Sequence, residues 1–220
     1  MSSIEYTDIV IPTYVIGLKS GEDRSKHIKK QFDGRMEFEV NIVKAIKEIN
    51  TPVDLWLSIV NVINLAIANQ DDVIIICQDD HEFTVDYSRD YLFQHIIEAH
   101  SQGTHLLIGG LTDFDQIVPL TEHRYWINTF VSTQFMVVYR NFFQQILEEI
   151  FTEEDTVSDK LSEMTSNKMV LHPFVSIQND PGTFSMHSDP YPINNGSGNA
   201  LFKAASERIT KLDEIYAKYT

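Results

Sequence analysis

An acidic cluster directly follows a strongly apolar stretch of the sequence. Residues 73–78 read VIIICQ, and their β-branched side chains predict a buried strand. The next four residues are Asp79, Asp80, His81 and Glu82. In open α/β sheets, ligands bind just outside the carboxyl ends of the strands. The position of this cluster therefore indicates a binding site.

Carboxylates packed together at the end of a strand repel each other and lose hydration, so such a cluster needs a compensating charge. A divalent cation is the simplest one, and oxygen ligands favour Mg²⁺ or Mn²⁺ over zinc. The cation would also neutralise the phosphates of an anionic substrate. The alternative is that the acids only end a strand at the protein surface, because short acidic pairs after strands are common.

The charge of the chain limits the classes of partner. Its 220 residues include 17 Lys and Arg against 32 Asp and Glu, which gives a formal net charge of −15. Binding to a phosphate backbone needs clustered Lys and Arg, so we expect no nucleic-acid partner.

The sequence also predicts a cytoplasmic protein without a transmembrane segment. Its apolar stretches are short of the ~18 residues that a membrane span needs. The N-terminal sequence MSSIEYTD is polar and acidic, unlike a signal peptide. A single cysteine, Cys77, excludes an intramolecular disulfide and is expected to be a small buried hydrophobe.

The elements that must position the cluster alternate between strand and helix in the first half of the chain. Strands are predicted at residues 9–18, 36–43, 73–78 and in GTHLLIGG, and helices from Ser20, over 52–69 and near 88–101. This alternation is typical of an α/β sheet that is mostly parallel and covered by helices on both faces.

The second half of the sequence is less regular. Strand-like stretches are predicted at 124–139 and 170–178, with Pro173 as a break, and short helices at 141–151 and 155–164. We expect one domain over 1–188. Residues 189–199, DPYPINNGSGN, follow it as a linker by composition.

A C-terminal amphipathic helix is predicted over 200–220. Its apolar residues recur at spacings of three and four, and they are Phe202, Ala205, Ile209, Leu212, Tyr216 and Tyr219. We expect this helix to pack back on the domain, because a coiled coil this short is marginal alone. The alternative is a seam against a second chain, which would make a homo-oligomer.

Several motifs occur in the order in which one family has them. YVIGLKSGEDRSKH at 14–27 is a strand followed by Asp-Arg at the start of a helix, and QDD at 78–80 ends the central strand. VSTQFMVVYRNFFQQIL at 131–147 comes next, followed by an acid and then by Pro173, Gln178 and Ser185. In these motifs the chain resembles glycosyltransferase family 25, the lipopolysaccharide-type sugar transferases with the GT-A fold. IVIPTY is also similar to the opening of family 2 transferases, which share that fold.

The resemblance implies transfer of a sugar, with inversion, from a nucleotide-sugar donor to a saccharide acceptor of a surface polysaccharide or lipopolysaccharide. We expect the donor to be a UDP-sugar. It also implies Mn²⁺ or Mg²⁺ as cofactor. Asp80 and His187 are expected to bind the metal. The expected donor contacts are Leu18, Arg24, Gln78 and Asp79, although Arg24 has a surface salt bridge as its alternative role. Asp159 is our first choice and Asp155 our second for the catalytic base.

Two positions depart from the family pattern. Gln78 stands where the family has an acid, and Gly17 stands where it has Asn after Val-Ile. A catalytically inactive sugar-nucleotide-binding or assembly protein of the same fold is therefore the alternative function. A metal-dependent phosphoesterase on a related sheet is a third possibility.

Overall fold

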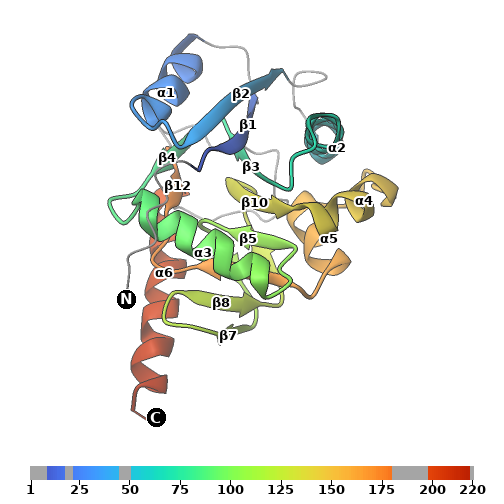
Figure 1. Ribbon diagram of the computed structural model, residues 1–220. Coiled ribbons are helices and arrows are strands. Elements are labelled where there is room, and N and C mark those ends of the chain that lie inside the picture. Colours follow the sequence, from blue (N-terminus) through green and yellow to red (C-terminus); the bar gives the residue numbers. More distant parts are fainter. Residues whose placement is uncertain (1–8, 18–21, 45–50, 180–197, 219–220) are drawn as a thin grey trace.

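The computed structural model describes residues 9–17, 22–44, 51–179 and 198–218 (Figure 1). Leu18, His187 and most of the predicted linker lie outside the described residues. The helices are α1 (Glu22–Phe32), α2 (Pro52–Asn69), α3 (Arg89–Ser101), α4 (Arg140–Glu148), α5 (Val157–Met164) and α6 (Gly198–Tyr216).

Eight strands form one sheet in the order β2-β1-β3-β10-β5-β11-β8-β7. Their bounds are β1 (Ile11–Gly17), β2 (Phe38–Lys44), β3 (Val73–Gln78), β5 (Leu106–Ile108), β7 (Ile117–Pro119), β8 (Arg124–Ile127), β10 (Phe135–Tyr139) and β11 (Lys168–Leu171). Strands β8 and β10 run opposite to the other six, so the sheet is mostly parallel. The predicted α/β class is thereby confirmed.

Two short ribbons flank this sheet. Strand β4 (His81–Phe83) pairs with β12 (Ser176–Gln178), and β6 (Asp113–Phe114) pairs with β9 (Phe130–Val131). Both ribbons are antiparallel, and each joins segments that are far apart in the sequence. They matter because the residues around the acidic cluster belong to them or directly adjoin them.

Helices cover both faces of the sheet. Side chains of α1 and α3 pack in one core, and those of α2, α4, α5 and α6 pack in the other. Strand β3 contributes to both, with Ile75 and Cys77 on the first side and Ile74 and Ile76 on the second. Cys77 is fully buried, as predicted, and burial raises the pKa of its thiol far above the usual range.

Helix α2 begins and ends with clear caps. The Thr51 side chain accepts a hydrogen bond from the Asp54 backbone N–H, Pro52 opens the helix, and Gln70 ends it in the left-handed region. Among the described residues, α2 is the one helix whose 18 residues and mean hydropathy of 1.3 suffice for a membrane span, a requirement that we expected no stretch to meet. Seven of its side chains are nevertheless buried inside the protein, as in an ordinary core helix.

Helix α6 packs back on the domain, as we expected. Phe202, Ala205 and Ile209 are buried in the core, and Leu212 packs against it. Tyr216 is 45% exposed. The apolar seam is therefore covered by the domain in its first half, and the C-terminal end of α6 extends past β7 and β8 (Figure 1).

Candidate functional site

The acidic cluster lies where the sheet changes its direction of winding. From β1 the chain passes through α1 to β2 on one side, and β3 pairs with β1 on the other side. Helices α1 and α2 cover opposite faces of the sheet. Such a switch point opens a crevice at the carboxyl ends of the two central strands, and ligands of open α/β proteins bind there. Asp79 and Asp80 directly follow β3 at this crevice.

A guanidinium group compensates the two carboxylates. Asp79 and Asp80 are each only 4% exposed. Arg24, in the first turns of α1, places Nη1 2.6 Å from Asp79 Oδ1 and 3.6 Å from Asp80 Oδ2. Two acids and one Arg leave this group of three with one net negative charge. The surface salt bridge that we considered for Arg24 is instead a contact inside the acidic site.

Two side-chain amides fix the carboxylate of Asp80. Gln134 Nε2, just before β10, donates to Asp80 Oδ1 at 2.7 Å, and Gln178 Nε2, at the end of β12, donates to Oδ2 at 2.9 Å. Gln78 does not take part in this contact. Its Nε2 donates to Thr133 Oγ1 at 2.7 Å, and this ties the end of β3 to the segment that leads into β10.

His81 supports the site from inside the core. The ring is fully buried and its Nδ1 lies 2.8 Å from Ser176 Oγ. Burial is the main cause that lowers the pKa of His81 to about 3, and the nearby Arg35 guanidinium adds to it. The ring is therefore neutral near neutral pH.

His27 connects α1 to the same cluster. Its Nε2 donates to the backbone carbonyl of His81 at 2.8 Å, and its Nδ1 accepts from Asn179 Nδ2 at 3.0 Å. The Asn179 backbone N–H in turn donates to the Asp80 carbonyl at 2.7 Å. Helix α1, the end of β3 and the end of β12 are thus held together by hydrogen bonds around Asp80.

The donor set does not suit a divalent cation within the described residues. At least three of the four carboxylate oxygens of Asp79 and Asp80 already face N–H donors. The described part of the chain also brings no three His, Cys, Asp or Glu side chains together in a metal-binding arrangement. These residues do not form a metal site by themselves, and no chemical step below passes through a metal. His187, our second predicted ligand, lies outside the described residues.

Of the two candidates for the catalytic base, Asp159 lies in the first turn of α5 and Asp155 lies just before the helix. Asp159 exchanges hydrogen bonds with Thr156, the N-cap residue, through its backbone N–H at 3.2 Å and its Oδ2 at 2.8 Å. It also lines a cavity of about 660 Å³.

Asp155 is held in a different way. It accepts hydrogen bonds from the Thr152 backbone N–H and hydroxyl and pairs with Lys160 at 3.1 Å. These contacts, led by the Thr152 backbone N–H, lower the pKa of Asp155, which weakens it as a base. Of the two acids, Asp159 is therefore the one suited to act on a ligand.

The structure thus places Arg24, Asp79 and Asp80 in contact, with Gln78 at the end of the same strand. The contacts described for Asp155 and Asp159 are with Thr152, Thr156 and Lys160. Sequence reasoning did not assign roles to Gln134 and Gln178, the two amides that orient Asp80. Both lay within quoted motifs, but only the antiparallel pairings of β10 with β3 and of β12 with β4 show that they meet Asp80.

Comparison with known proteins finds solved structures of similar fold and no family. No family model and no curated protein matches the chain. A solved structure, A197 from STIV, is similar with a TM-score of 0.50 and 10% identity, over 77% of this chain and 85% of A197. At that identity the likeness concerns the fold alone.

Two further solved structures are similar at TM-scores below 0.5, and we draw no argument from them. One is a glycosyltransferase involved in glycosylation of the major capsid of PBCV-1 (0.49, 11% identity, 79% of this chain and 94% of that one). The other is UDP-glucose pyrophosphorylase complexed with UDP-glucose (0.48, 10% identity, 91% and 81%). The architecture predicted from the sequence, a mostly parallel sheet flanked by helices with a C-terminal helix, is confirmed by the structure itself.

Proposed function

We propose that this protein is a glycosyltransferase that takes a sugar from a nucleotide-sugar donor, UDP-linked by preference, and transfers it to a saccharide acceptor. The observation that carries the proposal is the group of Arg24, Asp79 and Asp80 at the switch point of the sheet. A buried pair of acids costs stability, and such groups concentrate at functional sites.

Each member of the group has a role in donor binding. Arg24, with its side chain 22% exposed, can turn its free N–H groups toward the diphosphate, which a guanidinium binds in bidentate fashion. Asp79 and Asp80 are acceptors for hydroxyl groups of the ribose or the donor sugar. The amides of Gln134 and Gln178 keep Asp80 in one orientation while this happens.

The proposed reaction is a single displacement with inversion. The acceptor hydroxyl oxygen forms a bond to the anomeric carbon of the donor sugar. The bond from that carbon to the diphosphate breaks, and its electron pair leaves with the nucleoside diphosphate. The hydroxyl proton passes to a carboxylate, for which Asp159 is our choice because it lines a cavity.

The narrower predictions belong to the same proposal. On the motifs quoted above we propose membership of the lipopolysaccharide-type family 25 and a surface polysaccharide or lipopolysaccharide acceptor. A cytoplasmic location is proposed from the polar N-terminal sequence and the single cysteine. Dependence on Mn²⁺ or Mg²⁺, with Asp80 and His187 as ligands, stays a prediction. It is tested by measuring nucleotide binding with each cation and with a chelator.

The proposal is tested with a panel of nucleotide sugars. A thermal-shift screen selects the donor that stabilises the protein, and release of free nucleoside diphosphate from that donor is then followed. Asp80→Asn should reduce release at least about 100-fold, because it removes a charge that faces the donor. Asp33→Asn, at an exposed position after α1, makes the same charge change outside the site and should leave the rate unchanged.

Two other results would redirect the assignment. A donor that binds but is never turned over by the wild-type protein would support the inactive binding protein instead. Release of inorganic phosphate without a nucleoside diphosphate would support a phosphoesterase.

A further inference from the structure

A cavity of about 660 Å³ lies between the ribbon of β6 and β9, the first turn of α5 and the face of α6. A neighbouring cavity of about 480 Å³ shares the lining residues Thr129 and Asp159 with it. We call them together the α5 groove. The residues of the groove used below are Asp113, Asp115, Thr129, Val131, Asp159, Glu163, Lys168, Leu201, Ala204 and Arg208.

The basic side chains of the groove are already engaged. Arg208 hydrogen-bonds to the Asp113 carboxylate and to the Phe114 carbonyl, and its guanidinium lies 4.1 Å from the centre of the Phe114 ring. It therefore holds α6 against the β6–β9 ribbon. Lys168 is 2% exposed and donates to the carbonyls of Ser162 and Thr165 at the end of α5. Neither group is placed to receive an anionic ligand.

The acids and hydroxyls of the groove are the groups left for a ligand. The carboxylate of Asp115 is exposed and makes no hydrogen bond or ion pair within the described part of the chain. Asp159 uses only Oδ2 in its bond to Thr156. Glu163 and the Thr129 hydroxyl lie alongside. Carboxylates accept hydrogen bonds and attract cations, so these groups suit ligands with many hydroxyls or with an amine.

The apolar part of the lining fits the same kind of ligand. Val131, Leu201 and Ala204 give the groove an apolar wall beside its acids. A sugar ring has C–H faces that pack on such a wall and hydroxyls at its rim that donate to carboxylates. Small-molecule sites are usually lined by apolar side chains with a small number of polar groups among them.

A short segment of the chain joins the groove to the residue that orients Asp80. Val131 lines the groove, and Gln134, three residues later, holds Asp80. Three residues span at most ~11 Å even when fully extended. This edge of the groove and the residue that orients Asp80 therefore belong to one short segment of the chain.

We propose that the α5 groove is the acceptor site and that it takes neutral or amino-substituted saccharides and rejects acidic ones. This inference rests on the proposed function, because an acceptor site presupposes a donor. The reason is the negative charge of the groove wall. The carboxylate of an acidic sugar would lie next to those of Asp115 and Asp159 and be repelled. The ammonium group of an amino sugar would be attracted there.

The test compares three trisaccharides of equal length in the presence of UDP. The probes are a neutral glucose trisaccharide, a glucosamine trisaccharide and a galacturonic acid trisaccharide, with affinities measured by ligand-observed NMR. We expect the amino and neutral probes to bind, and the acidic probe to bind at least about tenfold more weakly than the amino probe. Asp115→Lys should reduce the affinity ratio of the amino to the acidic probe at least about fivefold, and Asp115→Asn should reduce this ratio less.

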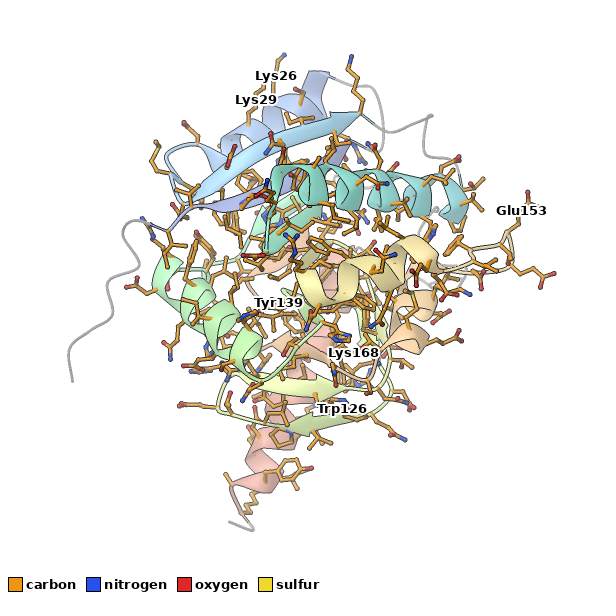
Figure 2. All side chains as sticks on the ribbon, turned by 45° about the vertical axis from the view of Figure 1, so that its right-hand side comes forward. Lys26, Lys29, Trp126, Tyr139, Glu153 and Lys168 are labelled. Carbon is orange, nitrogen blue, oxygen red and sulfur yellow. The ribbon has the colours of Figure 1, made fainter. Side chains whose placement is uncertain are left out.

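A matched control separates the groove from the general acidity of the protein. Glu153 projects into solvent from the segment between α4 and α5 (Figure 2), and Glu153→Lys makes the same charge change there. Glu153→Lys should leave the affinity ratio of the amino to the acidic probe within about twofold, because Glu153 is exposed and does not line the groove. An equal effect of Glu153→Lys and Asp115→Lys would overturn the inference.

The remaining outcomes distinguish this inference from the proposed function. Binding of UDP with no trisaccharide bound, or with the acidic probe bound most tightly, would overturn the acceptor groove and leave the donor site standing. If a trisaccharide binds and UDP does not, the proposed function is overturned and a saccharide site remains. If neither UDP nor a trisaccharide binds, both are wrong.

Discussion

Replacing Arg24 by Gln should destabilise the protein through the two acids that it faces. The carboxylate oxygens of Asp79 and Asp80 lie 2.6 and 3.6 Å from the same Arg24 nitrogen, so they are at most 6.2 Å apart. Two like charges at that distance repel by about 3 kcal/mol at an effective dielectric constant of about 20. The Arg24→Gln variant bears this repulsion without compensation, and we expect it to lose about 2–4 kcal/mol of unfolding free energy.

A double-mutant cycle isolates this effect. Asp79→Asn removes one partner and the repulsion together, so alone it should change the stability by less than about 1 kcal/mol. In the Arg24→Gln background the same change should restore about 2 kcal/mol, which is the coupling energy. Urea unfolding, followed by circular dichroism, measures all four proteins.

The control for this cycle is Lys29→Gln. Lys29 is exposed on the same helix and points away from the sheet (Figure 2), and its replacement makes the same charge change. It should cost less than about 0.5 kcal/mol. Additive effects of Arg24→Gln and Asp79→Asn would refute the reasoning, because Arg24 would then not compensate the acids.

Three further predictions follow from other parts of the structure. Burial and the nearby Arg124 guanidinium lower the pKa of His95 from 6.5 to about 4. The unfolding free energy should therefore fall as the pH drops from 6.5 toward 4, and His95→Gln should make this pH dependence less steep by up to about 1.4 kcal/mol per pH unit. Gly110→Ala would place Cβ 2.0 Å from the carbonyl oxygen of Ser176, so it should cost about 1–3 kcal/mol in urea unfolding. Asp159→Asn should lower sugar transfer at least about 100-fold, and Asp155→Asn should lower it less than about threefold.

Each of these has a control or a contradicting result. A stability profile of His95→Gln parallel to that of the wild type would mean that the ring titrates normally when folded. Gly17→Ala is the control for Gly110, because its Cβ would meet no atom closer than 3.8 Å and should leave the stability unchanged. Equal losses of activity in the two α5 variants would remove Asp159 as the base.

The sequence predicts the elements whose residues repeat at a regular spacing. Helix α2 and strand β3 have the predicted bounds, because an apolar face at helical spacing and an unbroken β-branched run depend on local residues alone. The strands of the two ribbons have only two or three residues each, and they exist because distant segments pair. Strands β9 and β12 fall within the strand-like stretches predicted at 124–139 and 170–178, but their pairing with β6 and β4 does not follow from a local pattern.

The same division applies to the site. Asp79 and Asp80 were found because a strand ends there, and Arg24 because a helix begins there after the first strand. Their meeting follows from the parallel pairing of β1 and β3. The need for a compensating charge was also predicted. In the described residues the compensating charge comes from Arg24, whereas we expected it to come from a metal ion. The sequence could not show this, because Arg24 and Asp79 are far apart in the chain and only the fold brings them together.

The most direct test of the central claim is a crystal structure of the protein with UDP bound. The account predicts that the diphosphate lies within hydrogen-bond distance of Arg24 and that Asp79 or Asp80 accepts a hydrogen bond from the nucleotide, at the ends of β1 and β3. A nucleotide bound elsewhere, with the Arg24 contacts to both acids unchanged, would contradict it.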